Sequence, residues 1–510
     1  MGQTEGSAAK GWFGHPKGLS TLFFTEMWER FSYYGMRAIL LLFMTAPVAV
    51  GGLGWDAAKA GPIYGLYTAM VYLTALPGGW LADRFLGQRR AVLYGGILIA
   101  MGHLSLTMHG LGFFYFGLFL ITVGTGLLKP NISTMVGALY REDDNRRDAG
   151  FSIFYMGINT GGFIAPLVCG FLAQDERFRG WLASVGISPE KSWHFGFGAA
   201  TVGMTLGIIQ YVLGGRRLGD TGLQPAVRLQ GAELARQSAR ARIGVALLAG
   251  LVCLVVVLQV MGLVMISPEL VTKIVGYALV IVPILYFGYF FLRKDWTSVE
   301  RKRLGAILLF FVFAALFWSA FEQAGSSLNL FAERFTRNEF LGVPFPSSWF
   351  QSVNNIFIVL LAPVFAWLWV RLGKRDPSSP AKFSVGMFFV SAGFLAVAFA
   401  AMLSGPAGER VSPLWLITVY FCHTVGELCL SPVGLSTMTR LAPARVAGQM
   451  MGIWFLALSM GNFIGGQVAG LFETFPLPRL FGAVFAVTMA CTIVLVLLVR
   501  PIRRLMVGVR

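Results

Sequence analysis

Six polar residues interrupt the first apolar stretch of the chain: two carboxylates, two guanidiniums and two phenols. At about 100° per residue of an α-helix, their side chains fall within an arc of roughly 140° on one face. They are Glu26, Glu29, Arg30, Tyr33, Tyr34 and Arg37. Charged groups inside a membrane helix are costly unless they face water or one another. This face is therefore expected to form a functional site, and the alternative is a buried structural ion pair.

The composition is that of a chain that crosses a membrane many times. Hydrophobic residues make up 56% of it and charged residues 13%, far from the balance of a soluble domain. The formal charge is +17, but the basic residues are scattered through short loops rather than gathered in a patch, so membrane topology explains them better than nucleic acid does. The five cysteines lie within apolar stretches without pairing or metal-ligand spacing. We expect no disulfide, metal site or cofactor.

Apolar windows long enough to cross roughly 30 Å of hydrocarbon predict fourteen spans. The N-terminal stretch through Lys17 has no signal-peptide core, so the first span is expected to be retained. The windows begin near Leu19, Ala57, Arg90, Gly112, Gly150, His194, Arg242, Leu270, Leu304, Trp349, Phe383, Pro413, Gly448 and Arg479. Clusters of basic residues occur at every second loop, which predicts that both termini are cytoplasmic.

One long polar connection, residues 215–240, predicts a boundary between two halves. The two spans that follow it are uniformly apolar, without interior charge, and are expected to be lipid-facing accessory helices. Six spans then remain on each side, as in transporters built from two related bundles. The predicted organisation is a cytoplasmic tail (1–18), an N-terminal six-helix bundle (19–214), a cytoplasmic linker (215–240), two accessory transmembrane helices (241–293), a C-terminal six-helix bundle (294–500) and a cytoplasmic tail (501–510).

Charged and amide residues in several spans together suit a zwitterionic ligand. Arg30 and Lys129 offer cationic donors for a carboxylate, whereas Glu427, with the amides of Asn159 and Asn354, suits a protonated amine. A short peptide has both poles. One interpretation is that four aromatic residues form walls of the ligand site that tolerate many ligand side chains: Tyr33, Tyr34, Tyr72 and Trp454. Ordinary packing explains each of them singly at least as well.

Lys129 directly precedes Pro130, which permits a local bend in the span. The bend would bring Lys129 to a cavity, and the alternative is that the lysine is a structural partner of Glu26 or Glu29. His423 lies one helical turn before Glu427. A core histidine satisfied by a neighbour is the favoured interpretation, and a place in a proton path is the alternative.

If this chain is a transporter driven by an ion gradient, it requires a titratable group whose charge biases its open forms, and Glu322 is the best candidate. Apolar surroundings favour its protonated form, whereas Arg37 or Lys129 nearby would favour the carboxylate, so a proton and an ion pair compete for it. Glu26 and Glu29 are further candidates for proton binding beside Arg30.

Two motifs carry a resemblance to known transporters. The run Gly79-Trp-Leu-Ala-Asp83-Arg84-Phe-Leu-Gly87-Gln-Arg89-Arg90 resembles the signature loop of the major facilitator superfamily, and Arg371-Leu-Gly373-Lys374-Arg375 weakly repeats it in the second half. More specifically, Glu26-Met-Trp-Glu29-Arg30-Phe-Ser-Tyr33-Tyr34 resembles the E-x-x-E-R-F-x-Y-Y motif of proton-coupled oligopeptide transporters.

Other segments resemble the same family along almost the whole chain. They are Gly124-Thr-Gly126-Leu-Leu-Lys129-Pro130-Asn131, Phe154-Tyr-Met-Gly-Ile-Asn159-Thr-Gly161, Phe317-Trp-Ser-Ala-Phe-Glu322-Gln323, Phe350-Gln-Ser-Val-Asn354 and Gly426-Glu427-Leu-Cys-Leu-Ser431-Pro432. Fourteen spans also match the bacterial members, which insert two helices between the bundles. The chain is identified as a member of this family, the bacterial type.

The resemblance implies an all-α major facilitator fold of two six-helix bundles plus two inserted helices. It further implies proton-coupled import of di- and tripeptides across the bacterial cytoplasmic membrane by alternating access, by a protein that functions as a monomer. Arg37 and Glu322 would form an extracellular gate, and proton coupling would involve Glu26, Glu29, Arg30, Lys129 and Glu322. The implied peptide-binding residues are Arg30, Tyr33, Tyr34, Tyr72, Lys129, Asn159, Asn354, Glu427, Ser431 and Trp454.

The sequence departs from the family pattern at two positions. Gly65 stands where animal members carry a histidine on the second helix, so a proton step at that histidine is not available here. Ala324 stands where many relatives have glutamine, with consequences expected for local hydrogen bonding or peptide preference.

Three rival functions stay open at this point. The first rival is also a transport function: this chain would be a relative that carries nitrate or another small anion or zwitterion. An intramembrane peptidase is the second, but the chain has no H-E-x-x-H motif and no supported serine–histidine pair, so we expect no enzyme. A receptor without transport is the third, and no soluble signalling domain is appended.

Three glycines of the last third of the chain, Gly461, Gly465 and Gly466, are either hinges or sites of close helix packing, and packing is the favoured interpretation.

Overall fold

The computed structural model describes residues 11–141, 144–225, 267–405, 409–443 and 446–509, with a few single positions between 236 and 261. Nearly all of this is helix. The predicted span from Arg242 to Ile266 lies outside the described residues. The helices of the first half are α1 (Lys17–Thr45), α2 (Ala57–Leu73), α3 (Ala75–Leu81), α4 (Gln88–Leu106), α5 (Leu111–Ala138), α6 (Arg147–Gln174), α7 (Glu176–Ser184) and α8 (Ser192–Leu213). Those that follow are α10 (Pro268–Leu292), α11 (Ser298–Phe321), α12 (Ser327–Phe335), α13 (Gln351–Leu372), α14 (Ser379–Leu403), α15 (Leu414–Leu441), α16 (Ala447–Ala469) and α17 (Leu477–Leu505).

Short elements connect the long helices. The 3₁₀ turns are η1 (Val48–Val50), η3 (Pro189–Lys191), η4 (Gly214–Leu218), η5 (Glu322–Gly325), η6 (Ser347–Phe350) and η7 (Gly373–Arg375), and η2 (Ala82–Leu86) is a π-helical turn. Strands β1 (Glu339–Phe340) and β2 (Val343–Pro344) pair antiparallel. Leu341 and Gly342 between them both have positive φ, as a two-residue hairpin turn of type I′ requires. No feature of the sequence analysis predicted this hairpin.

Ten of the described helical segments are long and apolar enough to cross a membrane. The chain is an integral membrane protein. Helix α1 is not among the ten, because it carries Glu26, Glu29, Arg30 and Arg37 within its apolar sequence. It is nevertheless the most enclosed helix of the first half: 23 of its 29 residues are buried. Protein neighbours rather than lipid therefore surround its charges.

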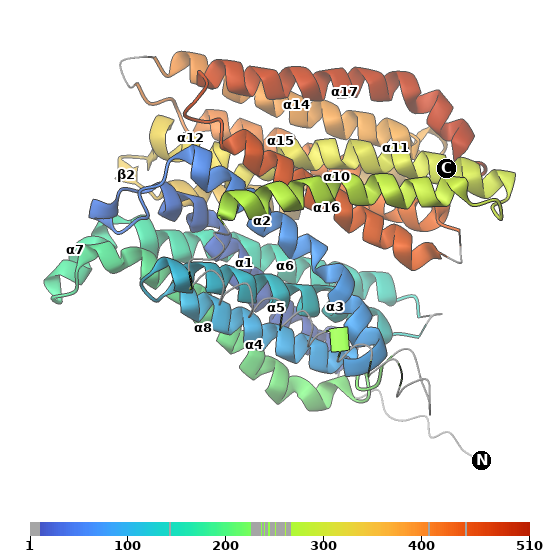
Figure 1. Ribbon diagram of the computed structural model, residues 1–510, viewed down its shortest axis with the longest axis horizontal. Coiled ribbons are helices and arrows are strands. Elements are labelled where there is room, and N and C mark those ends of the chain that lie inside the picture. The colour runs from blue at the N-terminus through green and yellow to red at the C-terminus, as the bar shows by residue number, and fades with distance from the viewer. Residues whose placement is uncertain are drawn as a thin grey trace.

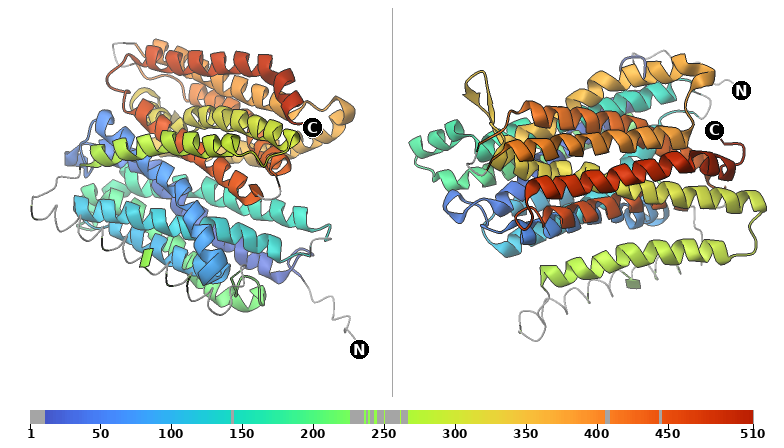
Figure 2. Two further views of the ribbon diagram at one scale, coloured as in Figure 1. Left: turned by 45° about the vertical axis from the view of Figure 1, so that its right-hand side comes forward. Right: turned by 90° about the horizontal axis from the view of Figure 1, so that it is seen from above.

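The long helices form two side-by-side bundles (Figures 1 and 2). In the first bundle α1 packs on α6 and α8, and α4 packs on α5. In the second, α14 packs on α15 and α17, and α11 packs on α16. Helix α1 begins and α17 ends at one end of the molecule, on the right in Figure 1, whereas α7 and β2 lie at the opposite end. We call the first the terminal end and the second the distal end.

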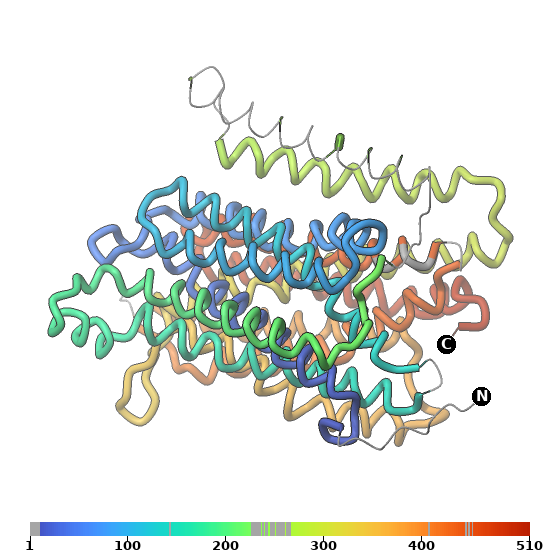
Figure 3. The backbone as a smooth tube through the Cα atoms, turned by 90° about the horizontal axis from the view of Figure 1, so that it is seen from below, coloured from blue at the N-terminus to red at the C-terminus, as the bar shows by residue number. Residues whose placement is uncertain are grey.

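Helix α10 runs along the outside of the bundles (Figure 3). It touches α2 and α16, where Gly276 lies against the ring of Phe463. Most of its other apolar side chains are exposed, among them Leu285 and Val282. This agrees with a lipid-facing accessory helix, the interpretation made from its uniform apolar sequence.

Glycines bring α2 and α16 into backbone contact between the two halves. A Cβ placed on Gly466 would lie 2.4 Å from the Cα of Gly65, and one on Gly461 would lie 2.5 Å from the Cβ of Trp318. The structure therefore shows close helix packing at these glycines, which was the favoured interpretation. It also gives a physical reason for Gly65, since a histidine side chain has no room where the two backbones meet.

Candidate functional site

The charged face of α1 is held together by Arg30. Its Nε lies 3.2 Å from Glu26 Oε1 and is also ion-paired with Glu29. All three side chains are almost fully buried. The guanidinium carbon of Arg30 lies 5.2 Å from the ring centroid of Tyr33 and 5.9 Å from that of Tyr34, within reach of a cation–π interaction.

This charged cluster is only partly satisfied. Within the described part of the chain, Glu26 Oε2, Glu29 Oε1, Arg30 Nη2 and the Tyr33 hydroxyl are buried without a hydrogen-bond partner. Buried polar atoms are normally paired, so unpaired ones call for an explanation such as a functional role. A proton on either carboxylate would remove its negative charge, and an anion at the guanidinium would pair the free Arg30 Nη2.

Lys129 on α5 supplies a second cation. Its Nζ lies 4.5 Å from the ring centroid of Tyr72 on α2, and the side chain is half-buried. No salt bridge joins it to Glu26, Glu29 or any other carboxylate among the residues the structure describes. The alternative interpretation, a structural partner of Glu26 or Glu29, therefore finds no support in the contacts.

The acidic pole lies on the second half. Asn354 on α13 donates from Nδ2 to Glu427 Oε2 on α15 at 3.3 Å, and Thr424 donates to Asn354 Oδ1 at 2.8 Å. These contacts hold the amide next to the carboxylate. Thr424 was missed by sequence reasoning, although its place three residues before Glu427 puts it on the same helix face.

The remaining predicted ligand-binding residues make no such polar network. Asn159 on α6 donates to the carbonyl of Tyr155, one turn earlier in its own helix. Trp454 on α16 is buried, and its ring packs against Gly434. Tyr34, Lys129, Asn354, Glu427 and Ser431, by contrast, are all half-buried, although they lie within long helices of both halves. A cavity of about 550 Å³, lined by Tyr155, Pro432 and Lys382 among others, adjoins this group on its terminal side.

Arg37 and Glu322 join the two halves. The guanidinium of Arg37 on α1 is ion-paired with Glu322 of η5, and its Nε donates to the Tyr64 hydroxyl on α2 at 2.8 Å. Both charged side chains are less than a tenth exposed. Of the two cations considered from the sequence, the structure pairs Arg37 with Glu322, not Lys129. Tyr64 was not predicted, because one tyrosine of an apolar helix gives no signal of its partner.

Further hydrogen bonds join the two halves besides this pair. Asn329 donates to the Ala38 carbonyl at 2.8 Å, Ser352 to the Phe163 carbonyl at 2.7 Å, and the Trp349 indole to the Leu167 carbonyl at 3.1 Å. Ser459 likewise donates to the Ala69 carbonyl at 2.8 Å. Side chains of four separate segments of the second half thus donate to backbone carbonyls of the first.

The structure also places Ala324 and His423. The carbonyl of Ala324 accepts from Gln351 Nε2 at 2.5 Å and from the Tyr420 hydroxyl at 3.4 Å, so the backbone rather than a side chain makes the hydrogen bonds here. His423 is buried between the rings of Phe321 and Phe394, at 5.9 and 5.3 Å. Burial agrees with the favoured interpretation of a core histidine, but neither ring nitrogen has a hydrogen-bond partner among the described residues, so the expected satisfaction by a neighbour is not seen there.

Two bundles of six long helices, with α10 inserted between them in sequence, define a transporter of the major facilitator superfamily. The family model described as the POT family matches residues 89–485, and the chain belongs to this family. It is 44% identical to the peptide transporter YePEPT of Yersinia enterocolitica over 97% of this chain and 96% of the relative. It is 39% identical to a di-/tripeptide transporter of Lactococcus lactis over 98% of each chain.

Solved structures of the family have the same fold. A crystal structure of a POT peptide transporter in complex with alafosfalin is 42% identical, with a TM-score of 0.87, and the match covers 98% of this chain and 97% of that one. A POT family transporter in complex with 5-aminolevulinic acid is 35% identical, with a TM-score of 0.86, over 97% and 98% of the two chains.

Proposed function

We propose that this protein is a proton-coupled symporter that imports di- and tripeptides by alternating access. It acts as a monomer in the bacterial cytoplasmic membrane, with both termini in the cytoplasm, so that the distal end faces outward. The relatives named as peptide and di-/tripeptide transporters, aligned over nearly their whole length, support the substrate class.

The observation that carries the proposal is the division of charge between the halves. The cations Arg30 and Lys129 lie on helices of the first bundle, and Glu427, held by Asn354, lies on the second. A short peptide carries a carboxylate and an ammonium group at its two ends. Binding both ends would tie the bundles together around the substrate, which is what alternating access requires of a ligand.

In the proposed coupling step, a proton competes with Arg37 for Glu322. Protonation removes the charge of Glu322, so the ion pair that joins α1 to η5 is lost and the distal side opens. The peptide carboxylate then binds near Arg30 and Lys129. Glu26 and Glu29, each with one unpaired oxygen beside Arg30, are the further proton-binding groups of the proposal.

The walls of the site would come from Tyr33, Tyr34, Tyr72, Asn159, Ser431 and Trp454. In the same proposal, residues 19–214 and 294–500 move against each other as two bodies, and residues 215–240 link them. The accessory helices of residues 241–293 stay on the lipid side.

The test is uptake of a radiolabelled dipeptide into liposomes, with and without an inside-alkaline pH gradient, for the wild type and for Glu322→Gln. The wild type is expected to concentrate the peptide only with the gradient. The variant should keep peptide exchange but lose concentrative uptake. Glu190→Gln, the same change at an exposed acid of the distal end, is the control and should behave as the wild type.

Two results would contradict the proposal in different ways. If the wild type moves no peptide under either condition, the substrate assignment is wrong, and nitrate or another small anion is the next substrate to assay. If Glu322→Gln still concentrates peptide with the gradient, Glu322 is not the coupling group, although the chain remains a peptide transporter.

A further inference from the structure

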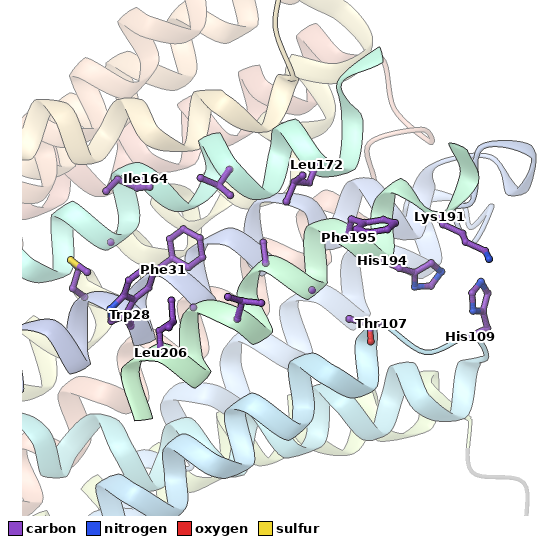
Figure 4. A pocket seen from close by; sticks show the side chains of 17 residues that line it. Trp28, Phe31, Thr107, His109, Ile164, Leu172, Lys191, His194, Phe195 and Leu206 are labelled. Carbon is purple, nitrogen blue, oxygen red and sulfur yellow. The ribbon is translucent and has the colours of Figure 1, made fainter. Parts of the chain in front are cut away.

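A groove on the outer face of the first bundle is separate from the site described above. It lies between α6 and α8, encloses about 840 Å³, and has side chains of α1 as its floor (Figure 4). The floor residues are Met27, Trp28 and Phe31. Trp28 and Phe31 point away from the charged face of α1, whereas Met27 lies at its edge, about 20° around the helix from Tyr34. None of the six polar residues of that face lines the groove.

Glycines create the groove by letting both neighbouring helices lie directly on α1. A Cβ on Gly161 of α6 would lie 2.2 Å from the carbonyl oxygen of Met27, and one on Gly203 of α8 would lie 2.4 Å from the ring of Phe31. Neither helix has a side chain at these positions to fill the space between them. The groove is therefore built into the packing of three helices.

The walls of the groove suit a hydrocarbon chain. Ile164, Val168, Val202 and Leu206 line it, and each is more than a third exposed. Because α6 and α8 are membrane-spanning helices, this exposed apolar surface faces lipid rather than water. An acyl chain is the occupant that this surface would meet in a bilayer.

The distal end of the groove is polar, in contrast to its walls. His109, Lys191 and His194 gather there (Figure 4), and the two imidazole centroids are 4.3 Å apart. In the described part of the chain, His194 Nδ1 is buried without a hydrogen-bond partner, and no carboxylate lies within salt-bridge distance of Lys191. An ammonium and two imidazoles are suitable donors for a phosphate group.

The length of the groove matches one leaflet. Leu206 lies twelve residues after His194, a rise of about 18 Å along α8, which is a little more than half of the roughly 30 Å hydrocarbon core. We propose that this groove binds one anionic glycerophospholipid of the distal leaflet. Its phosphate lies at His109, Lys191 and His194, and one acyl chain extends along α8 toward Trp28. This inference does not depend on which solute the protein transports.

The test is native mass spectrometry of the full-length protein in mixed micelles with equimolar phosphatidylglycerol and phosphatidylcholine. One phosphatidylglycerol is expected to stay bound to the wild type in preference to phosphatidylcholine. The triple variant His109→Gln/Lys191→Gln/His194→Gln should lower this occupancy by about tenfold or more, as the loss of charge-assisted contacts would. Val202→Trp, which fills the groove without changing its charge, should lower it as well.

Matched controls come from α10, which carries similar residues outside the groove. Lys273→Gln and Val282→Trp change an exposed lysine and an exposed valine there, and both should retain the bound phosphatidylglycerol. Equal occupancy by the two lipids in the wild type would overturn the proposal, since both carry a phosphate and only phosphatidylglycerol has a net negative charge, so the site would then have no preference for an anionic headgroup. Unchanged occupancy in either groove variant would overturn it too.

Discussion

The guanidinium of Arg37 on α1 is ion-paired with the carboxylate of Glu322 on η5, so two residues 285 positions apart connect the two halves of the transporter. Both side chains are buried, and Arg37 is also fixed by the hydroxyl of Tyr64. Removing one member of a buried pair leaves an uncompensated charge, at a cost of about 3–5 kcal/mol. The two members differ in how they can escape this cost.

We expect Glu322→Gln to lower the melting temperature more than Arg37→Gln does at pH 7. A glutamate left without its partner can take up a proton and become neutral, whereas an arginine cannot be deprotonated in a protein. The double variant should be more stable than the sum of the two single effects predicts. Thermal melting of the purified variants in detergent measures all three. Equal losses that add in the double variant would contradict the expected coupling.

The second prediction separates the two poles of the proposed peptide site. Glu427→Gln should weaken transport of a dipeptide with a free amino terminus by about tenfold to a hundredfold, the effect of a charge-assisted hydrogen bond worth about 1.5–3 kcal/mol. It should change transport of the N-acetylated dipeptide little. Lys129→Gln should show the reverse pattern, with loss for free carboxylates and little change for the C-terminal amide. The measurement is the KM of each variant for the three peptides.

Folding of the variants is checked by gel filtration, and Lys273→Gln on the outer helix α10 is the control for loss of a lysine. An equal loss for all three peptides in both variants would contradict the assignment of poles. In that case Lys129 and Glu427 would support the cavity without recognising the peptide ends.

The third prediction concerns the backbone contact of α2 with α16. A methyl group on Gly65 would lie 2.7 Å from the Cα of Gly466, so Gly65→Ala must push two helices apart. We expect a lower melting temperature and lost transport. Gly482→Ala on α17 is the matched control, because no atom lies within 4 Å of the added carbon. At Gly482 the usual gain of about 1 kcal/mol for Gly→Ala in a helix should leave the melting temperature unchanged or raise it. A Gly65→Ala variant as stable as this control would contradict the close approach.

The sequence predicted the helices well because a membrane makes hydrophobicity a nearly sufficient signal. The window at Leu19 corresponds to α1, which begins at Lys17, and the window at Leu270 to α10, which begins at Pro268. The break after Leu73, where α2 gives way to α3, was not predicted. Nor was the β1–β2 hairpin, because two-residue strands produce no periodic pattern.

Contacts within the site were predictable only where they are local. Glu26 and Arg30 have i, i+4 spacing, and their ion pair follows from it. The pair of Glu29 with Arg30 joins sequence neighbours, which this spacing does not predict. Tyr64 beside Arg37 and Gln351 beside Ala324 depend on how separate helices cross. No periodicity carries that information. The contact of Arg37 with Glu322 was expected from family resemblance rather than from the residues themselves.

A last prediction concerns Glu473, in the loop between α16 and α17 at the distal end. Its carboxylate is ion-paired with Arg334 Nη1 at 2.5 Å and accepts from the backbone N–H of Ala57, at the start of α2, at 3.0 Å. It thus ties the second half to the first. Partial burial acts to raise the pKa of Glu473, but the Ala57 N–H and the Arg334 guanidinium outweigh burial and hold this pKa below the usual range.

A carboxylate whose pKa is lowered by a contact stabilises that contact fully above its ordinary pKa of about 4.3. The stabilisation is lost as the pH falls through the lowered value. Both side chains are about a third exposed, so solvent screening limits the ion pair to less than about 1 kcal/mol. Glu473→Gln should therefore lower the melting temperature slightly and by the same amount at pH 7 and pH 5, and the difference from the wild type should shrink below about pH 4.

The matched control is Glu339→Gln on the exposed β1 strand of the same end, which should match the wild type throughout this range. A Glu473→Gln difference that already changed between pH 7 and pH 5 would contradict the lowered pKa. It would mean that the Ala57 N–H and Arg334 do not outweigh burial of the carboxylate, and the contact between α2 and the loop after α16 would then weaken within the physiological pH range.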